Sequence, residues 1–123
     1  MRWTEGMERR FRLRRATDFQ RLQREGRSWS HPLLVLVACR NGLDITRVGV
    51  TATRKIGKAV RRNRAKRLLR EAARHLHPRL EPGWDLLLIA RPEILQVKEP
   101  QVREALSLLA REAGLLRGGN GQG

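Results

Sequence analysis

The sequence has little of several residue types, and each shortage excludes a class of protein or site. Its 123 residues include one cysteine, Cys39, which excludes an internal disulfide. The three histidines, His31, His75 and His77, lack the partners and spacing of a zinc site. No apolar run approaches the roughly 18 residues of a membrane-spanning helix, and the Arg-rich first residues lack the apolar segment of a signal peptide. We therefore expect a soluble, cytoplasmic protein that holds no metal with its own side chains.

Acidic residues are scarce, and those present are scattered. The chain offers no DxD, DxE or clustered carboxylate pair of the kind that holds two metal ions in a nuclease. Its serines lack a recognisable arrangement with His and Asp, and there is no glycine-rich loop of the Walker or dinucleotide-binding type. We therefore expect no catalytic residues in this chain and interpret it as a binding protein.

Positive charge is abundant. The chain has 27 Lys and Arg against 12 Asp and Glu, a formal charge of +15 that opposes compaction unless a polyanion is bound. Nucleic acid is the first candidate and an anionic membrane surface the second. The apolar fraction of 40% supports a globular fold, and the length suits one domain over residues 1–117, with residues 1–10 flexible and a Gly-rich tail over 118–123.

The apolar pattern predicts helices and strands in a mixed order. A helix should begin at Thr17, with Gln20 completing a capping box, and end at Gly26. The Asn41–Gly42 pair predicts a hairpin between two neighbouring strands. The expected elements are a helix over 17–26, strands over 28–31, 32–39 and 45–53, a helix over 59–77, a strand over 85–90 and a helix over 99–116. This order predicts an α+β sandwich, in which helices pack on a small sheet.

The expected central helix contains the stretch RRNRAKRLLREAAR, from Arg61 to Arg74. Its apolar stripe on a helical wheel consists of Ala65, Leu68, Leu69, Ala72 and Leu76. Its polar stripe consists of Asn63, Lys66, Arg67, Arg70 and Arg74. Cations at this spacing repel one another, and Arg61, Arg62 and Arg64 crowd the helix end where the macrodipole also disfavours positive charge. An ordinary solvated face would mix signs, so this one is interpreted as a polyphosphate-binding face.

The segment RKIGKAVRRNRAKRLLREAAR resembles the hallmark motif of the bacterial ribonuclease P protein subunit. That motif is an Arg-Asn-Arg core followed by Lys-Arg, and here it is Arg62-Asn63-Arg64 with Lys66-Arg67. Further stretches are similar to the family in the same order: RLRRATDFQRL to its first helix, RVGVTATRKIGKAV to its third strand and GWDLLLIARP to its last strand. The resemblance covers about residues 11–113.

The resemblance implies a fold and a function. The fold would be an α-β-β-β-α-β-α sandwich, in which a left-handed crossover joins the third strand, the central helix and the last strand. The chain would be the small subunit of a ribonucleoprotein endonuclease that removes the 5′ leader from precursor tRNA. In that family the large RNA subunit, with Mg²⁺, is the catalyst, so the chain alone would need no cofactor.

The family's roles can be carried over by position. The residues expected to dock the catalytic RNA are Arg61, Arg62, Asn63, Arg64, Lys66, Arg67 and Arg70. The residues expected to line or flank the cleft for the single-stranded leader are Phe19, Arg54, Lys55, Lys58 and Arg91. The sequence departs from the family at Gln23 and Val37, where aromatics are frequent. Whether Phe19 is a stacking surface or a core residue stays open.

Three other functions compete with this interpretation. A structural RNA-binding protein of ribosomal type would share the composition, and only the ordered motif argues against it. A reader of double-stranded DNA would need several base-reading side chains, whereas the helix offers Asn63 alone among phosphate-type donors. A membrane-surface helix would carry bulky apolar residues opposite its charge, and here that face is small. The expected partners are therefore the catalytic RNA and precursor tRNA, without DNA or membrane.

Overall fold

The computed structural model describes residues 9–117 of the chain. The tail predicted over 118–123 and most of the flexible segment predicted over 1–10 lie outside this range. With η for a 3₁₀ helix, the elements are η1 Arg9–Phe11, α2 Ala16–Glu25, β1 Arg27–Ser30, β2 Leu34–Arg40, β3 Arg47–Ala52, η2 Arg54–Ile56, α3 Ala59–Leu76, η3 His77–Arg79, β4 Trp84–Ala90, η4 Pro92–Gln96 and α4 Glu99–Glu112. The α helices and strands confirm the predicted α-β-β-β-α-β-α order.

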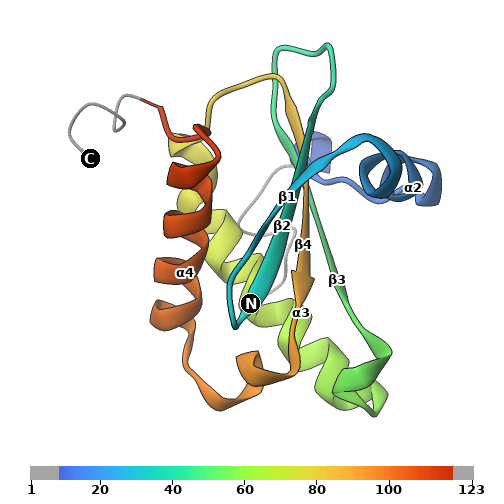
Figure 1. Ribbon diagram of the computed structural model, residues 1–123, viewed down its shortest axis with the longest axis vertical. Helices are drawn as coiled ribbons and strands as arrows, with labels where there is room; N and C mark the ends of the chain where they lie inside the picture. Colours follow the sequence, from blue (N-terminus) through green and yellow to red (C-terminus); the bar gives the residue numbers. More distant parts are fainter. Residues whose placement is uncertain (1–8, 118–123) are drawn as a thin grey trace.

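The strands form one mixed sheet in the order β1-β2-β4-β3. β2 pairs with β1 and β4 in antiparallel fashion, whereas β3 and β4 are parallel neighbours. Because α3 connects two parallel strands, β3-α3-β4 is a crossover connection, and its left hand stays a prediction. Figure 1 shows α3 and α4 on one side of the sheet and α2 on the other.

Two apolar clusters hold these layers together. The larger one joins α3 and α4 to the sheet and includes Leu69, Leu109 and Leu88. The smaller one lies beneath α2 and is formed by Leu13, Leu22, Val37 and Leu87. Leu87 and Leu88 are adjacent in β4 and point to opposite faces, so this strand is covered on both sides.

The predicted hairpin at Asn41–Gly42 is wrong. β4 inserts between β2 and β3, so the strands on either side of this turn are not neighbours. The segment does bend as its residues favour: Gly42 has a φ of 74°, and the Asn41 side chain accepts a hydrogen bond from the Leu43 amide at 2.8 Å. The residues of a turn determine only the local bend. They do not determine whether a strand from far along the chain will insert between the two strands that the turn connects.

Two local expectations also need correction. The helix α2 begins at Ala16 with Arg15 as N-cap and no capping side chain, so the capping box at Thr17 is wrong. In α3, Leu68 is only half-buried, whereas Ala73 is buried. The predicted apolar stripe assumed that α3 packs on the sheet alone. Because α3 also packs against α4, its buried face is rotated around the helix toward Ala73.

Gly49 in β3 allows the N-terminal segment and α2 to approach the sheet closely. The Leu13 amide donates a hydrogen bond of 2.8 Å to the Val48 carbonyl, which brings the segment beside β3. A Cβ atom at position 49 would lie 2.7 Å from the Leu13 carbonyl oxygen and 2.8 Å from Cε1 of Phe19. Any larger residue would push Phe19 away from the sheet, so the placement of this aromatic ring depends on Gly49.

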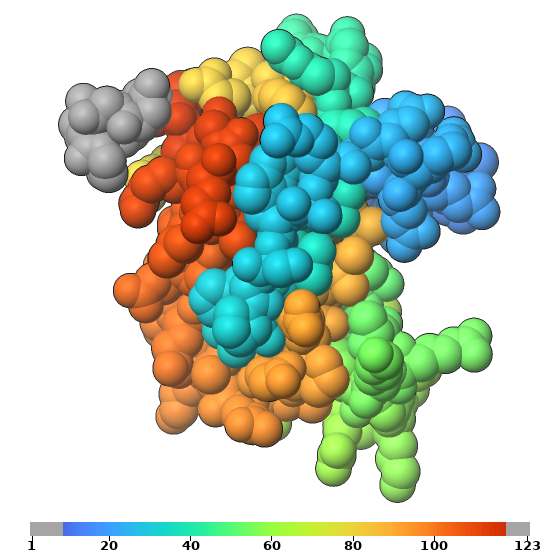
Figure 2. Space-filling view, viewed as in Figure 1, coloured from blue at the N-terminus to red at the C-terminus, as the bar shows by residue number. Residues whose placement is uncertain are grey.

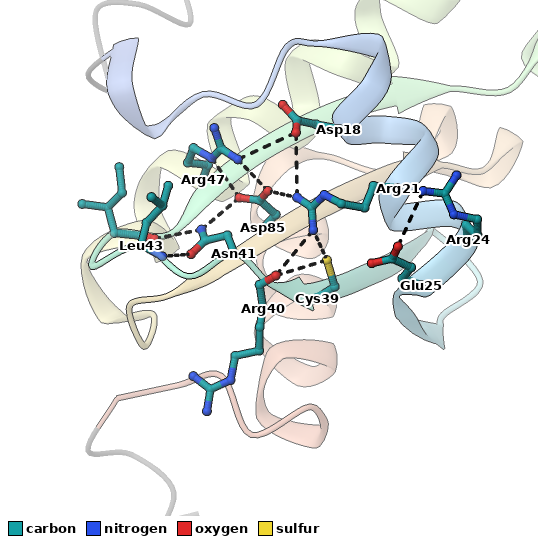
Figure 3. A network of polar contacts seen from close by, with 11 residues as sticks. Asp18, Arg21, Arg24, Glu25, Cys39, Arg40, Asn41, Leu43, Arg47 and Asp85 are labelled. Carbon is teal, nitrogen blue, oxygen red and sulfur yellow. Dashed lines mark hydrogen bonds and ion pairs between the residues drawn. The ribbon is translucent and has the colours of Figure 1, made fainter.

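A buried carboxylate ties α2 to three other parts of the fold. Asp85, at the start of β4, is fully buried. Its oxygens accept hydrogen bonds from Arg47 on β3, at 2.7 and 2.9 Å, and from Asn41 after β2, at 3.0 Å. The guanidinium of Arg21 on α2 donates to the same carboxylate (Figure 3). One carboxylate therefore joins α2, β3, β4 and the loop after β2.

These contacts also set the protonation of Asp85. Burial alone raises the pKa of a carboxyl group, but hydrogen bonds from Arg47 and Asn41 and the charges of Arg47 and Arg21 outweigh it. The net effect lowers the pKa of Asp85 below its ordinary value. The carboxylate is therefore ionised throughout the neutral range.

We expect Asp85→Asn to destabilise the fold by roughly 3–5 kcal/mol at pH 7, because two arginines lose their buried counter-charge. Since the folded pKa of Asp85 is lowered, its contribution is present above the unfolded pKa of about 3.9 and is lost as pH falls through the folded value. Urea unfolding at pH 7 and under progressively more acidic conditions should show the gap between wild type and variant narrowing in acid.

Asp18→Asn is the matched control for this prediction. Asp18 contacts the same two arginines, but at 3.8 and 3.9 Å and with a side chain 20% exposed. Its loss should cost less than about 1 kcal/mol. Equal losses for the two variants would show that the buried network carries no special share of the stability.

Candidate nucleic-acid interface

The first three turns of α3 carry positive charge that the described part of the chain does not neutralise. Of the residues predicted to dock the catalytic RNA, Arg61, Asn63, Arg64 and Arg67 are exposed, and Arg62, Lys66 and Arg70 are half-buried. Within residues 9–117, no ion pair forms at any of these cations. Arg74, one turn beyond Arg70 on the polar stripe, pairs instead with Glu71 at 2.7 Å. The uncompensated charge is thus confined to the beginning of the helix.

Local electrostatics at this helix end favour an anion. The first turn of α3 contains no acid, and its N-cap, Lys58, makes no capping side-chain bond. The helix macrodipole adds partial positive charge at the same place. Burial lowers the pKa of Arg70, and the neighbouring charge of Arg67 lowers it further. A bound phosphate would relieve this repulsion and would accept hydrogen bonds from the guanidinium groups.

The cations predicted to flank the leader cleft gather beside this helix end. β3 and β4 are parallel, and their last residues, Ala52 and Ala90, are paired. The segments that follow these two strands therefore lie side by side, at the same end of the strands. Gly57, with a φ of 106°, turns the chain from η2 into α3, and Arg62 donates a hydrogen bond of 3.0 Å to its carbonyl. This arrangement brings four exposed cations to that end of the strands, namely Arg54, Lys55, Lys58 and Arg91.

Phe19 lies on the same side of the sheet as α2 but at a distance from these cations. It is half-buried, it packs on the cluster beneath α2, and its ring sits over Gly49. Gly49 is three residues from the end of β3, which places the ring roughly 10 Å from the strand end. The structure therefore separates Phe19 from Arg54 and Arg91 by a short stretch of sheet.

That stretch is a strip of partly exposed sheet surface. Val35 pairs with Ile89, and Ile89 pairs with Thr51, so these side chains form one row across β2, β4 and β3. All three are half-buried, whereas the next row beneath α2 is fully covered. Figure 2 shows the surface hollowed between α2 and the long side chains that project from η2 and the start of α3. We call Val35, Ile89 and Thr51 the sheet strip.

The sheet strip was missed by sequence reasoning. Finding it required the pairing of β2 with β4 and of β4 with β3, and the expected hairpin placed β3 beside β2 instead. The signal available was the alternation of Thr51 and Thr53 with apolar residues, which indicates that one face of β3 is not fully covered.

The described part of the chain shows neither a group of side chains that could hold a metal ion nor a membrane-spanning helix. Among residues 9–117, His, Cys, Asp and Glu side chains do not come together in threes in a way that could hold a metal ion. The helices of the same residues are each too short or too polar to span a bilayer.

Comparison with known proteins identifies the family of this chain. The sequence model of the family described as Ribonuclease P matches residues 7–114. A protein of Roseiflexus castenholzii named ribonuclease P protein component is 40% identical over 113 residues, covering 91% of this chain and 93% of that protein. A protein of Herpetosiphon aurantiacus with the same name is 40% identical over 109 residues, covering 89% of each.

Solved structures agree with the sequence comparison. The RNase P protein of Thermotoga maritima superposes with a TM-score of 0.72 at 38% identity and covers 81% of this chain and 96% of that one. The RNase P protein of Staphylococcus aureus gives a TM-score of 0.76 at 28% identity, with 87% and 98% covered. The fold, the sequence and the motif at the start of α3 thus agree, and this chain belongs to the ribonuclease P protein family.

Proposed function

We propose that this chain is the protein subunit of a ribonuclease P ribonucleoprotein and assists endonucleolytic removal of the 5′ leader from precursor tRNA in the cytoplasm. In this proposal the catalytic RNA subunit carries the chemistry with Mg²⁺, and the protein supplies binding surfaces. The observation that carries the proposal is the uncompensated cationic start of α3, held beside the sheet strip in a chain of this family.

The start of α3 is assigned to the catalytic RNA. A rigid helix presents its guanidinium groups in fixed geometry, and Arg binds phosphate through two parallel hydrogen bonds. Arg61, Arg64 and Arg67 are exposed, and long side chains project from this end of the molecule (Figure 2), where a large folded RNA can reach them. These residues would set the position of the protein on the RNA subunit through backbone contacts.

The sheet strip and its surroundings are assigned to the leader. The strip spans three strands, so its outer strands are roughly 10 Å apart, which suits one extended RNA strand. Its floor is apolar, Phe19 offers an aromatic ring at one end, and the cations of η2 and Arg91 lie at the other. Single strands are bound by this combination of stacking surface and positive groove. A ribosomal-type RNA-binding protein, the alternative, would leave the strip without a role.

Reconstitution tests the proposal as a whole. The purified chain is added to a bacterial ribonuclease P RNA, and cleavage of precursor tRNA is followed at low Mg²⁺. We expect the chain to restore leader removal that the RNA performs poorly alone under these conditions, because its cations offset phosphate repulsion between the two RNAs. No stimulation at any protein concentration would contradict the proposal, and so would leader removal by the chain without the RNA subunit.

Arg64→Ala combined with Arg67→Ala should weaken assembly with the catalytic RNA and leave the fold intact, since both side chains are exposed. Each phosphate contact contributes about 0.9 to the negative slope of log affinity against log salt. We expect the slope to become shallower by about 1 to 2. The measurement is equilibrium binding of protein to the catalytic RNA over a salt series.

Arg103→Ala combined with Arg111→Ala removes the same charge from another helix, α4, and serves as the control. It should change the slope little. Similar slopes for the two double variants would show that only net charge matters and that the α3 stripe is not the docking face.

Phe19→Leu should reduce the affinity of the reconstituted enzyme for precursor tRNA but not for mature tRNA. Stacking of a base on an aromatic ring contributes roughly 1–3 kcal/mol, and with Gln23 in place of a second aromatic we expect the low end, about a fivefold loss. Leu22→Ala, three residues further along α2 at a fully buried position, is the control. This control variant should lower the thermal stability and should change the affinities for precursor and mature tRNA by the same factor. Equal losses for both tRNAs with Phe19→Leu would assign this residue to the core.

A further inference from the structure

A second cationic surface lies on the N-terminal segment, outside both regions described above. The segment runs along the free edge of β3, where Arg12 forms a parallel bridge with Val48 and the Leu13 amide donates to the Val48 carbonyl. Leu13 is 3% exposed and packs beneath α2. Because neighbouring side chains of an extended chain alternate, Arg12 and Arg14 point away from that cluster.

These arginines surround a hollow of about 570 Å³. The described residues of the lining are Arg9, Arg10, Arg12, Arg14 and Arg15 from this segment, together with Arg47 and Asp18. Asp18 offsets only part of this charge, because its single carboxylate is shared between Arg21 at 3.8 Å and Arg47 at 3.9 Å. Among the residues that the structure describes, six arginines and one acid line the hollow.

Arg12 is held in an unfavourable state by the fold as it stands. Its Nε is buried and has no hydrogen-bond partner among the described residues. Burial lowers the pKa of Arg12, and the charges of Arg14, Arg9 and Arg70 lower it further. A buried donor without an acceptor costs free energy, and so does a crowd of like charges. An anion in the hollow would remove both penalties.

The hollow also interacts electrostatically with the α3 stripe. The charge of Arg70 lowers the pKa of Arg12, and the charge of Arg67 lowers the pKa of Arg70, so these three side chains are near enough to repel one another. Arg12 is the link, because it lines the hollow and also feels the charge of α3.

We propose that the hollow at Arg12 and Arg14 is a second phosphate-binding site, which takes backbone phosphodiesters of an RNA strand. It rests on the proposed function and adds an anchor to it, separate from the start of α3 and from the sheet strip. Paired guanidinium groups suit phosphodiester oxygens, because each can donate two parallel hydrogen bonds. The strand belongs either to the catalytic RNA or to precursor tRNA, and both present the same chemistry.

Arg12→Met gives the sharpest test, because it keeps the apolar stem and removes the buried Nε and the charge. A binding role predicts opposite effects on stability and on affinity. The melting temperature without RNA should stay equal or rise, whereas RNA affinity should fall about fivefold at 0.15 M salt for each lost contact. A fall in melting temperature with unchanged RNA affinity of the folded protein would make Arg12 structural and overturn the proposal.

The double variant Arg12→Met with Arg14→Ala should lose roughly 10- to 30-fold in affinity at 0.15 M salt and flatten the salt slope by about 1 to 2. Arg103→Ala with Arg111→Ala is again the control of equal charge. Two titrations are run: protein against the catalytic RNA, and assembled enzyme against precursor tRNA. A loss in the first assigns the site to the catalytic RNA, and a loss in the second assigns it to precursor tRNA. Values equal to the control in both titrations would overturn the site.

Failure of this site can be told apart from failure of the proposed function. Arg64→Ala with Arg67→Ala is measured beside it in the same titrations. If that variant weakens assembly and the Arg12 variants match the control, the function stands and the second site falls. If neither differs from the control, RNA docking by this face is itself wrong.

Discussion

The buried carboxylate of Asp85 is the interaction on which the rest of the structure depends. It lies at the start of the central strand β4 and receives hydrogen bonds from Asn41 and Arg47 and from Arg21 on α2. In a chain of charge +15, one anion in the interior attracts two arginines that would otherwise repel each other. Because α2 is fixed in this way, it covers one part of the sheet and leaves the sheet strip uncovered.

Charge is divided unevenly around this centre. Residues 93–112, which include α4, hold four acids and three cations, so that side is nearly neutral. The remaining 24 cations and eight acids belong to the rest of the chain, and much of the excess lies on the N-terminal segment, η2 and α3. The helix α4 can therefore pack as an ordinary amphipathic helix, while the N-terminal segment, η2 and α3 carry the charge that attracts a polyanion. The helices α3 and α4 thus share one side of the sheet but differ sharply in charge.

The sequence predicted more of the helices than of the sheet, for physical reasons. The stripe of Ala65, Leu69, Ala72 and Leu76 reports the buried face of α3 because helix periodicity is local. Sheet order is not local: β2 and β3 are close in sequence, yet β4 comes between them. The sheet strip and the network at Asp85 could not be predicted for the same reason, since both are formed by residues of several strands. A lone acid at the head of an apolar strand could not indicate which arginines would reach it.

The position of β4 in the sheet has a consequence for the order in which the protein assembles. β2 and β3 leave the ribosome well before β4, yet each of them has its inner edge paired only with β4. Until residue 90 is available, both strands present open edges, and Arg21 and Arg47 lack their shared anion. Contacts such as Arg47 with Asp85 join residues 38 positions apart, and such separations slow folding. The sheet thus closes in one late step, when a single strand brings both the missing backbone pairs and the missing negative charge.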